Sequence, residues 1–168
     1  MDLRRVRTSD WAAGLFGAAL IGLLWAPWYR AFERPSGTFF FDRSRLPASD
    51  WSGWQSMAVN DVIFLVAGLL GIWVVVATAT QSTGAVPIAA DAFASLVGVV
   101  ASVLAVIRLI WPPDLGLGPT NRAAGVWLGT GAALAMTFSA LASISSERRG
   151  EGVEVPVTPL PAPRGTEP

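Results

Sequence analysis

The chain has 168 residues, of which 52% are hydrophobic and only 14% are charged, and its formal net charge is zero. A soluble domain would carry about 25% charged residues, and a net charge of zero makes no strong electrostatic case for nucleic acid as a partner. The sequence has no Cys, no His and no Lys. This composition excludes disulfides, thiolate or imidazole metal sites, histidine bases and Schiff-base chemistry. We therefore expect no cofactor, no metal and no catalytic residue.

Four apolar stretches with almost no charge at their centres fill most of the chain, at about residues 11–28, 57–78, 87–111 and 123–144. Each is close to the roughly 20 residues that a helix needs to cross a hydrocarbon layer about 30 Å thick. We therefore predict an all-α membrane protein, a bundle of four transmembrane helices. The sequence further predicts one aromatic-rich extracytoplasmic loop and a disordered C-terminal tail.

The chain divides into a transmembrane domain, residues 1–149, and a Pro-rich tail, residues 150–168, without hydrophobic periodicity. The basic start and first apolar stretch resemble a secretory signal, but bulky Trp28 and Tyr29 stand where cleavage needs small residues. We predict that the first span is retained. The loop at residues 29–56 is rich in aromatic residues, notably Phe39, Phe40, Phe41, Trp51 and Trp54. These rings either lie at the headgroup level and cap the bundle or form a surface for a partner or lipid.

The orientation of the spans rests on weaker signals. Five Arg residues flank each side of the predicted membrane, so a count of positive charges does not decide between the two orientations. The cluster of Arg4, Arg5 and Arg7 lies directly before the first span, and the number of spans is even. We therefore predict a multi-pass protein of a bacterial inner membrane with both termini in the cytoplasm.

Small residues recur at four-residue spacing in two of the predicted helices. The first span has Gly14, Ala18 and Gly22, and the last has Gly125 and Gly129. Because lipid tails are as apolar as Leu, close approach of backbones at small residues supplies much of the packing between membrane helices. We predict that these residues form helix contacts within the bundle. One face of the last helix is left for a partner or a second copy.

Three ionisable residues lie inside the predicted spans: Asp61, Asp91 and Arg108. A charge within a span is costly and is a candidate for function. Asp61 and Arg108 reach similar depth in an antiparallel hairpin, so we predict a salt bridge between them with Asn60 as a hydrogen-bond partner. The pair would be a structural staple or a polar binding site. None of the three is near the middle of the membrane, which argues against a proton relay.

One part of the chain resembles a group of uncharacterised four-helix membrane proteins common in GC-rich Gram-positive bacteria. The likeness rests on Ala26-Pro27-Trp28-Tyr29, on Ser52-Gly53-Trp54 and on Asn60-Asp61. It covers about residues 10–75. Members of the group usually have Leu before Pro-Trp-Tyr, whereas this chain has Ala26. The resemblance implies a fold and a location but no activity.

The sequence favours an integral membrane protein without catalytic activity that acts as an accessory or interaction subunit. Its expected partners are membrane lipids and either another protein or a second copy within the membrane, and not nucleic acid. One alternative is a small permease or channel component that would have to oligomerise to build a pore. A further alternative is a membrane enzyme acting on lipid or isoprenoid substrates, although no paired acidic residues suited to a metal lie within the spans.

Overall fold

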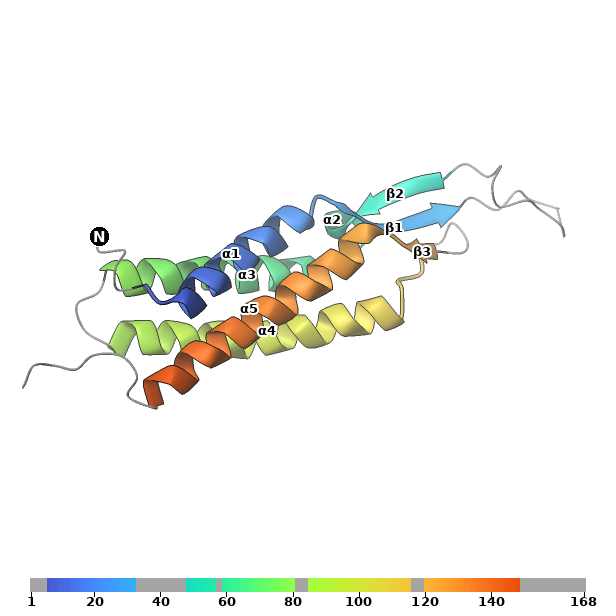
Figure 1. Ribbon diagram of the computed structural model, residues 1–168. Helices are drawn as coiled ribbons and strands as arrows, with labels where there is room; N and C mark the ends of the chain where they lie inside the picture. The colour runs from blue at the N-terminus through green and yellow to red at the C-terminus, as the bar shows by residue number, and fades with distance from the viewer. Residues whose placement is uncertain (1–5, 33–47, 57–58, 81–84, 116–119, 149–168) are drawn as a thin grey trace, which may run out of the picture.

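The computed structural model describes residues 6–32, 48–56, 59–80, 85–115 and 120–148. In these ranges four long helices lie side by side in an elongated bundle, with a small sheet at one end (Figure 1). The long helices are α1 (Thr8–Leu23), α3 (Asn60–Thr80), α4 (Ala85–Ile110) and α5 (Ala124–Arg148). The strands are β1 (Pro27–Phe32), β2 (Ala48–Ser52) and β3 (Thr120–Arg122), and α2 (Gly53–Ser56) is a single turn. The predicted tail, residues 150–168, lies outside the described residues.

The four long helices form a closed ring in which neighbours run antiparallel. α1 packs on α3 and α5, and α4 packs on the same two helices. The starts of α1 and α4 therefore lie at the end of the bundle away from the sheet, together with the ends of α3 and α5 (Figure 1).

Three of the helices are long and apolar enough to cross a membrane: Asn60–Thr80, Ile88–Ile110 and Ala124–Ser145. These agree with the predicted spans to within a few residues. α1 differs, because its helix has 16 residues and ends at Leu23, whereas the first span was predicted to reach residue 28. Pro27 and Trp28 belong to β1 instead. Pro cannot donate the backbone hydrogen bond that would continue the helix.

The sheet is a feature that the all-α prediction omitted. Its strand order is β2-β1-β3 and both pairings are antiparallel. Tyr29 on the central strand lies opposite Trp51 on one side and Arg122 on the other. The sheet thus ties together three segments that leave the bundle at the same end, after α1, before α3 and before α5.

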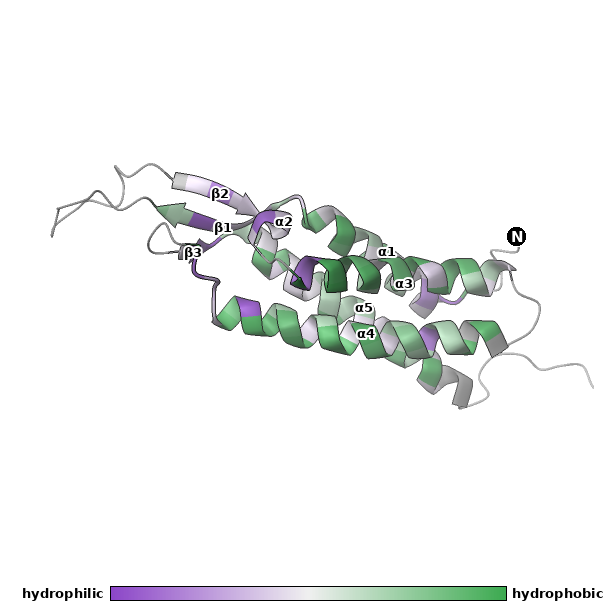
Figure 2. Ribbon diagram, turned by 180° about the vertical axis from the view of Figure 1, so that it is seen from behind, coloured by the Kyte–Doolittle hydropathy of each residue, from purple (hydrophilic) through white to green (hydrophobic). Residues whose placement is uncertain are grey.

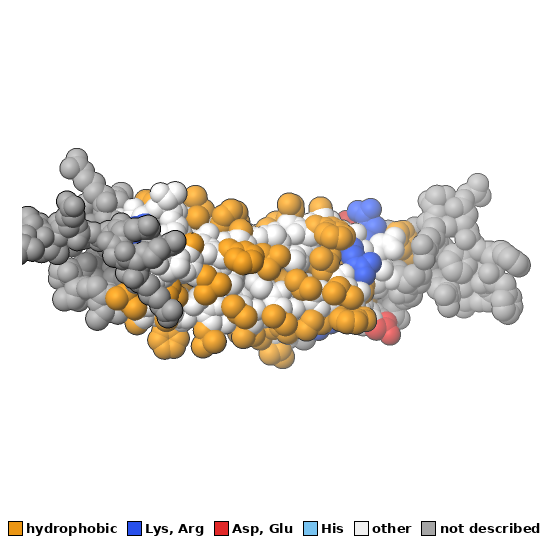
Figure 3. All heavy atoms as spheres, turned by 60° about the horizontal axis from the view of Figure 1, so that its bottom comes forward, with side chains coloured by type: hydrophobic (Ala, Val, Ile, Leu, Met, Phe, Trp, Pro, Cys, Tyr) orange, Lys and Arg blue, Asp and Glu red, His pale blue; other side chains and the backbone are white. Residues whose placement is uncertain are grey.

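The bundle is apolar outside and carries polar groups inside. Large apolar side chains on the four helices are more than half exposed, for example Leu15, Leu69, Leu96 and Phe138. Conversely, the buried polar residues include Asp10, Asp91, Ser102, Thr137 and Ser143. Figure 2 shows that most residues along the four helices are hydrophobic, and the space-filling view shows apolar side chains spread along the length of the bundle on the face it presents (Figure 3). This is the arrangement expected where the surroundings of the helices are apolar.

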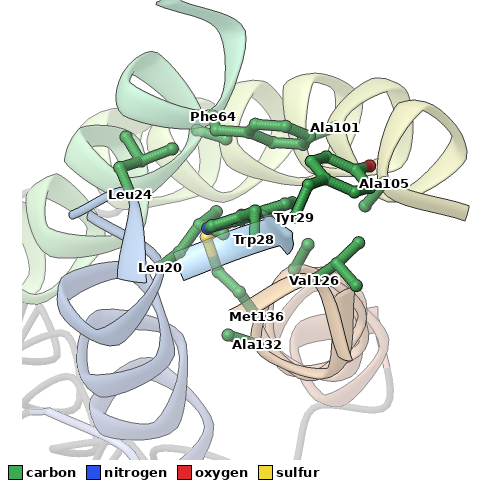
Figure 4. Packing of buried hydrophobic residues seen from close by; sticks show 12 residues of the cluster. Leu20, Leu24, Trp28, Tyr29, Phe64, Ala101, Ala105, Val126, Ala132 and Met136 are labelled. Atoms are coloured by element: carbon green, nitrogen blue, oxygen red, sulfur yellow. The ribbon is translucent and has the colours of Figure 1, made fainter. Parts of the chain in front are cut away.

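The largest buried side chains gather near the sheet end of the bundle (Figure 4). Trp28 and Tyr29 of β1 reach in among Phe64 of α3 and Val126 of α5, and all four are fully buried. The rings of Trp28 and Phe64 lie 5.7 Å apart, and the indole N–H of Trp28 donates to the carbonyl oxygen of Leu23 at 2.7 Å. The strand that follows α1 therefore closes one end of the bundle with its own side chains.

Candidate functional site

The predicted partners Asp61 and Arg108 lie at the same end of the bundle, but no ion pair joins them in the described structure. The Asp61 carboxylate is 7% exposed and accepts a hydrogen bond from the backbone N–H of Val62 at 2.8 Å. Asn60, the first residue of α3, does not connect the two. Asp61 is in the first turn of α3 and Arg108 in the last turn of α4. Each charge therefore interacts favourably with the dipole of its own helix without needing the other.

The C-terminal end of α4 is capped by two side chains from the sheet. The hydroxyl of Tyr29 donates to the carbonyl oxygen of Arg108 at 2.8 Å. The guanidinium of Arg122 donates to the carbonyl oxygens of Leu109 and Ile110. Burial raises the pKa of Tyr29 to about 12, although the positive charges of Arg108 and Arg122 oppose that rise. These contacts satisfy carbonyl groups that a helix end otherwise leaves open, so we assign this cluster a structural role.

The row of small residues on α1 is only partly turned toward another helix. Gly14 faces α3, and a Cβ added there would lie 2.5 Å from the side chain of Val75. Ala18 and Gly22 are exposed. Gly17, which is outside that row, also faces α3, where an added Cβ would lie 2.6 Å from the carbonyl oxygen of Gly68.

Gly125 and Gly129 of α5 do face a neighbour, but it is the segment after α1 rather than a helix. A Cβ on Gly125 would lie 2.4 Å from the carbonyl oxygen of Pro27, and one on Gly129 would lie 2.4 Å from Cζ2 of Trp28. The two glycines thus leave a notch in α5 that the indole of Trp28 fills.

The most unusual polar cluster joins three helices at the end of the bundle away from the sheet. The hydroxyl of Ser143 on α5 lies 2.8 Å from Oδ1 of Asp10 on α1 and 2.9 Å from Oδ2 of Asp91 on α4. All three side chains are at most 2% exposed. Asp10 also accepts the backbone N–H of Arg7 at 3.1 Å, which closes the first turn of α1. The sequence pattern singles out Asp91 but not Asp10 or Ser143.

The chemistry of this cluster depends on where its hydrogens are. A serine hydroxyl has one hydrogen and donates to one acceptor at a time. Its second short contact becomes a hydrogen bond only if the other carboxyl carries a proton. The contacts of the serine hydroxyl with both carboxyls join α1, α4 and α5 at this end.

A second polar contact between helices lies farther along α4 and α5. The hydroxyls of Ser102 and Thr137 are 3.0 Å apart and buried. Gly98 makes room beside them, since a Cβ there would lie 2.6 Å from the hydroxyl oxygen of Thr137. Hydrogen bonds between membrane helices stabilise their association modestly, so this contact is suited to fixing how α4 and α5 sit against each other.

Three of the cavities lie on the faces of the long helices and are lined mainly by apolar side chains. A cavity of about 660 Å³ lies between α4 and α5, opens outward, and is lined mainly by Ile88, Leu96, Val99, Leu141 and Ile144. Within the described residues, no three or more acidic side chains gather in a way that could hold a metal ion. The cavity between α4 and α5 therefore presents mainly apolar side chains.

The sheet carries exposed charges. Arg30 and Asp50 pair across β1 and β2, with the Arg30 Nε 2.7 Å from Oδ1 of Asp50. The hydrogen bond from Arg30 holds the pKa of Asp50 below its usual value. Both side chains are about half exposed, at 51% and 49%, so water screens this pair and it contributes little to stability.

Comparison of the chain with protein-family models, with curated proteins and with solved structures found no match.

Proposed function

We propose that this protein is a non-catalytic membrane protein whose four long helices all lie in the bilayer and which acts as an accessory or interaction subunit of a membrane assembly. The observation that carries the proposal is a distribution of side chains opposite to that of a soluble protein. Apolar residues cover the outside of the four helices, while carboxyls and hydroxyls are turned inward. Such a surface is stable against lipid or against other membrane helices.

Exposed Trp residues support a membrane-embedded placement. Trp25, Trp111 and Trp127 are each about three-fifths exposed and lie near the sheet end of α1, α4 and α5. Trp side chains are enriched at the boundary between lipid and water. This belt supports a placement of the sheet outside the hydrocarbon layer, at the headgroup level or beyond it.

α1 is the shortest of the four long helices, and the proposal includes it as a fourth span. Its 16 residues extend about 24 Å, which is shorter than an average hydrocarbon layer. Thinning of the bilayer around a short helix accommodates such a mismatch at modest cost. α1 also packs between α3 and α5 along its length, and Leu15 and Phe16 are exposed on its outer side.

The open edges of the sheet favour a role in interaction. The outer edges of β2 and β3 have no strand beside them in the described sheet, and an open sheet edge can pair with a partner's strand. The same proposal puts both termini in the cytoplasm and the sheet on the opposite side of the membrane. Membership of the group of membrane proteins from GC-rich Gram-positive bacteria stays a prediction.

Single-cysteine labelling tests the number of spans cleanly, because the chain has no Cys of its own. We expect Leu15→Cys, Leu69→Cys and Phe138→Cys to resist a membrane-impermeant maleimide in intact membranes. Asn121→Cys on the sheet is the accessible control. Rapid labelling of Leu15→Cys alone would show that α1 does not enter the bilayer.

The interaction role is tested by a photo-reactive amino acid placed on the sheet edge at Ser49 and, as a control, at Ser145 on the opposite end of the bundle. An interaction through the sheet predicts a discrete cross-linked species from Ser49 only. Failure to cross-link in native membranes, together with a purified monomer, would contradict the assignment as a subunit.

A small permease or channel component is the second candidate, favoured by the polar contacts of Asp10, Asp91 and Ser143 in the bundle interior. Proteoliposomes containing the protein would then conduct protons or small ions, and Asp91→Asn would abolish the flux. Flux equal to that of protein-free vesicles would leave the accessory role as the better explanation.

A further inference from the structure

A hollow of about 350 Å³ lies where the sheet meets the start of α5. It is lined by Pro27, Arg30 and Phe32 of β1 and by Asn121, Arg122, Ala123 and Ala124. Its polar lining therefore consists of two guanidinium groups and one amide, and its remaining lining is apolar. It differs in this from the cavity between α4 and α5, which no basic side chain borders.

The donors around this hollow are not used up by the protein itself. A guanidinium has five N–H groups. Arg30 directs two of its nitrogens to Asp50, and Arg122 directs two to the last carbonyls of α4. Asn121 is exposed, and its side-chain amide donates to no other described residue. Several N–H donors thus remain for an outside acceptor.

The charge balance favours an anion. Arg30 and Asp50 cancel, which leaves the charge of Arg122 in excess. The hollow also borders the first turn of α5, a helix of 25 residues, whose N-terminal end carries a partial positive charge. In the space-filling view, basic side chains lie beside the apolar surface at the sheet end of the bundle (Figure 3).

The position of the hollow identifies the source of the anion. Trp127 and Leu128, one turn further along α5, are 58% and 59% exposed. An exposed Trp marks the boundary of the hydrocarbon layer, so the hollow lies at the level of lipid phosphates. An acyl chain could continue from it along the apolar surface of α5. A free phosphate ion would use the donors but not that surface.

We infer that this hollow binds the phosphate headgroup of an anionic phospholipid in the leaflet on the sheet side, with Arg30, Asn121 and Arg122 as donors. The inference rests on the placement in the bilayer proposed above. Phosphatidylglycerol, as the probe, should raise the melting temperature of the detergent-solubilised protein more than phosphatidylcholine does.

Variants that change charge in opposite directions test this inference. Arg30→Gln removes one positive charge, whereas Asp50→Asn removes the negative charge beside it. We expect apparent affinity for phosphatidylglycerol to fall about fivefold in the first variant and to rise by a similar factor in the second, the effect of roughly one basic residue near an anionic lipid. Both variants lose the same ion pair, so a purely structural role of that pair would move them in the same direction.

The readout is the number and affinity of bound lipids measured by native mass spectrometry, which does not depend on any activity. Arg7→Gln, at the opposite end of the bundle, is the matched control. Equal binding of phosphatidylglycerol and phosphatidylcholine would overturn the inference, as would an equal effect of inorganic phosphate alone. If single-cysteine labelling showed the bundle to lie outside the bilayer, the proposed function would fail. Loss of the preference for phosphatidylglycerol in detergent would instead overturn the inference alone, so the two failures are distinguishable.

Discussion

The indole of Trp28 fills the notch that Gly129 leaves in α5, where an added Cβ would lie 2.4 Å from Cζ2 of the ring. Trp28 is fully buried, and its N–H is fixed by the carbonyl oxygen of Leu23. The ring is therefore held between α5 and the end of α1. This contact joins the segment after α1 to the first two turns of α5.

Gly129→Ala should consequently lower the free energy of unfolding by about 1–3 kcal/mol, the usual cost of overpacking a filled core. Gly131→Ala on the same helix is the control, because a Cβ there meets nothing within 4 Å. We expect the control to be neutral or slightly stabilising, since Ala favours a helix over Gly by about 1 kcal/mol. Unfolding in mixed micelles measures both, and equal stability of the two variants would contradict the notch.

Ser143→Ala should destabilise the bundle by about 1–3 kcal/mol, because it removes the hydroxyl that lies between two buried carboxyls. The control is Ser139→Ala, whose hydroxyl bonds only to the carbonyl oxygen of Ala135 in its own helix. Its loss should cost less than about 0.5 kcal/mol. The same unfolding assay applies, and a comparable loss in both variants would argue against the bridge between Asp10 and Asp91.

Asp61 and Arg108 should behave independently, because the structure forms no ion pair between them. In a double-mutant cycle with Asp61→Asn and Arg108→Gln, the two effects on unfolding free energy should add to within about 0.5 kcal/mol. A coupling energy well above that value would restore the salt bridge that the sequence predicts. A second double-mutant cycle, with Tyr29→Phe and Arg122→Gln, gives a coupling energy for comparison, since those two residues cap the same end of α4.

The carboxyl of Asp50 should titrate below an ordinary Asp, because the hydrogen bond from Arg30 favours its charged form. A pKa lowered by folding contributes stability above the unfolded pKa and loses it as the pH falls through the folded value. In Arg30→Gln the titration midpoint, followed by NMR, should return to the ordinary Asp range. Arg122→Gln is the control. A midpoint that Arg30→Gln leaves unchanged would show that the hydrogen bond from Arg30 does not lower the pKa of Asp50.

The sequence by itself determined the positions of the three apolar helices, because the length of an apolar stretch is a local property. The predicted stretches at residues 57–78, 87–111 and 123–144 match α3, α4 and α5 to within a few residues. The end of α1 was less well determined. Pro27 requires the helix to end before it but does not specify which residue is the last one. The pairing of Tyr29 with Arg122 joins positions far apart in the chain, so no local pattern predicts the sheet.

Tertiary structure alone decided which small and polar residues meet. A row of small residues shows that a backbone can approach closely, but the rotation of the helix decides which row does so. α1 therefore uses Gly14 and Gly17 and leaves Gly22 exposed. The same rotation turns Asp10 inward toward Ser143, which is 133 positions away in the sequence. From the sequence alone, a carboxyl near the start of a helix is interpreted as an ordinary cap. Only the packing of three helices brings it into a buried polar cluster.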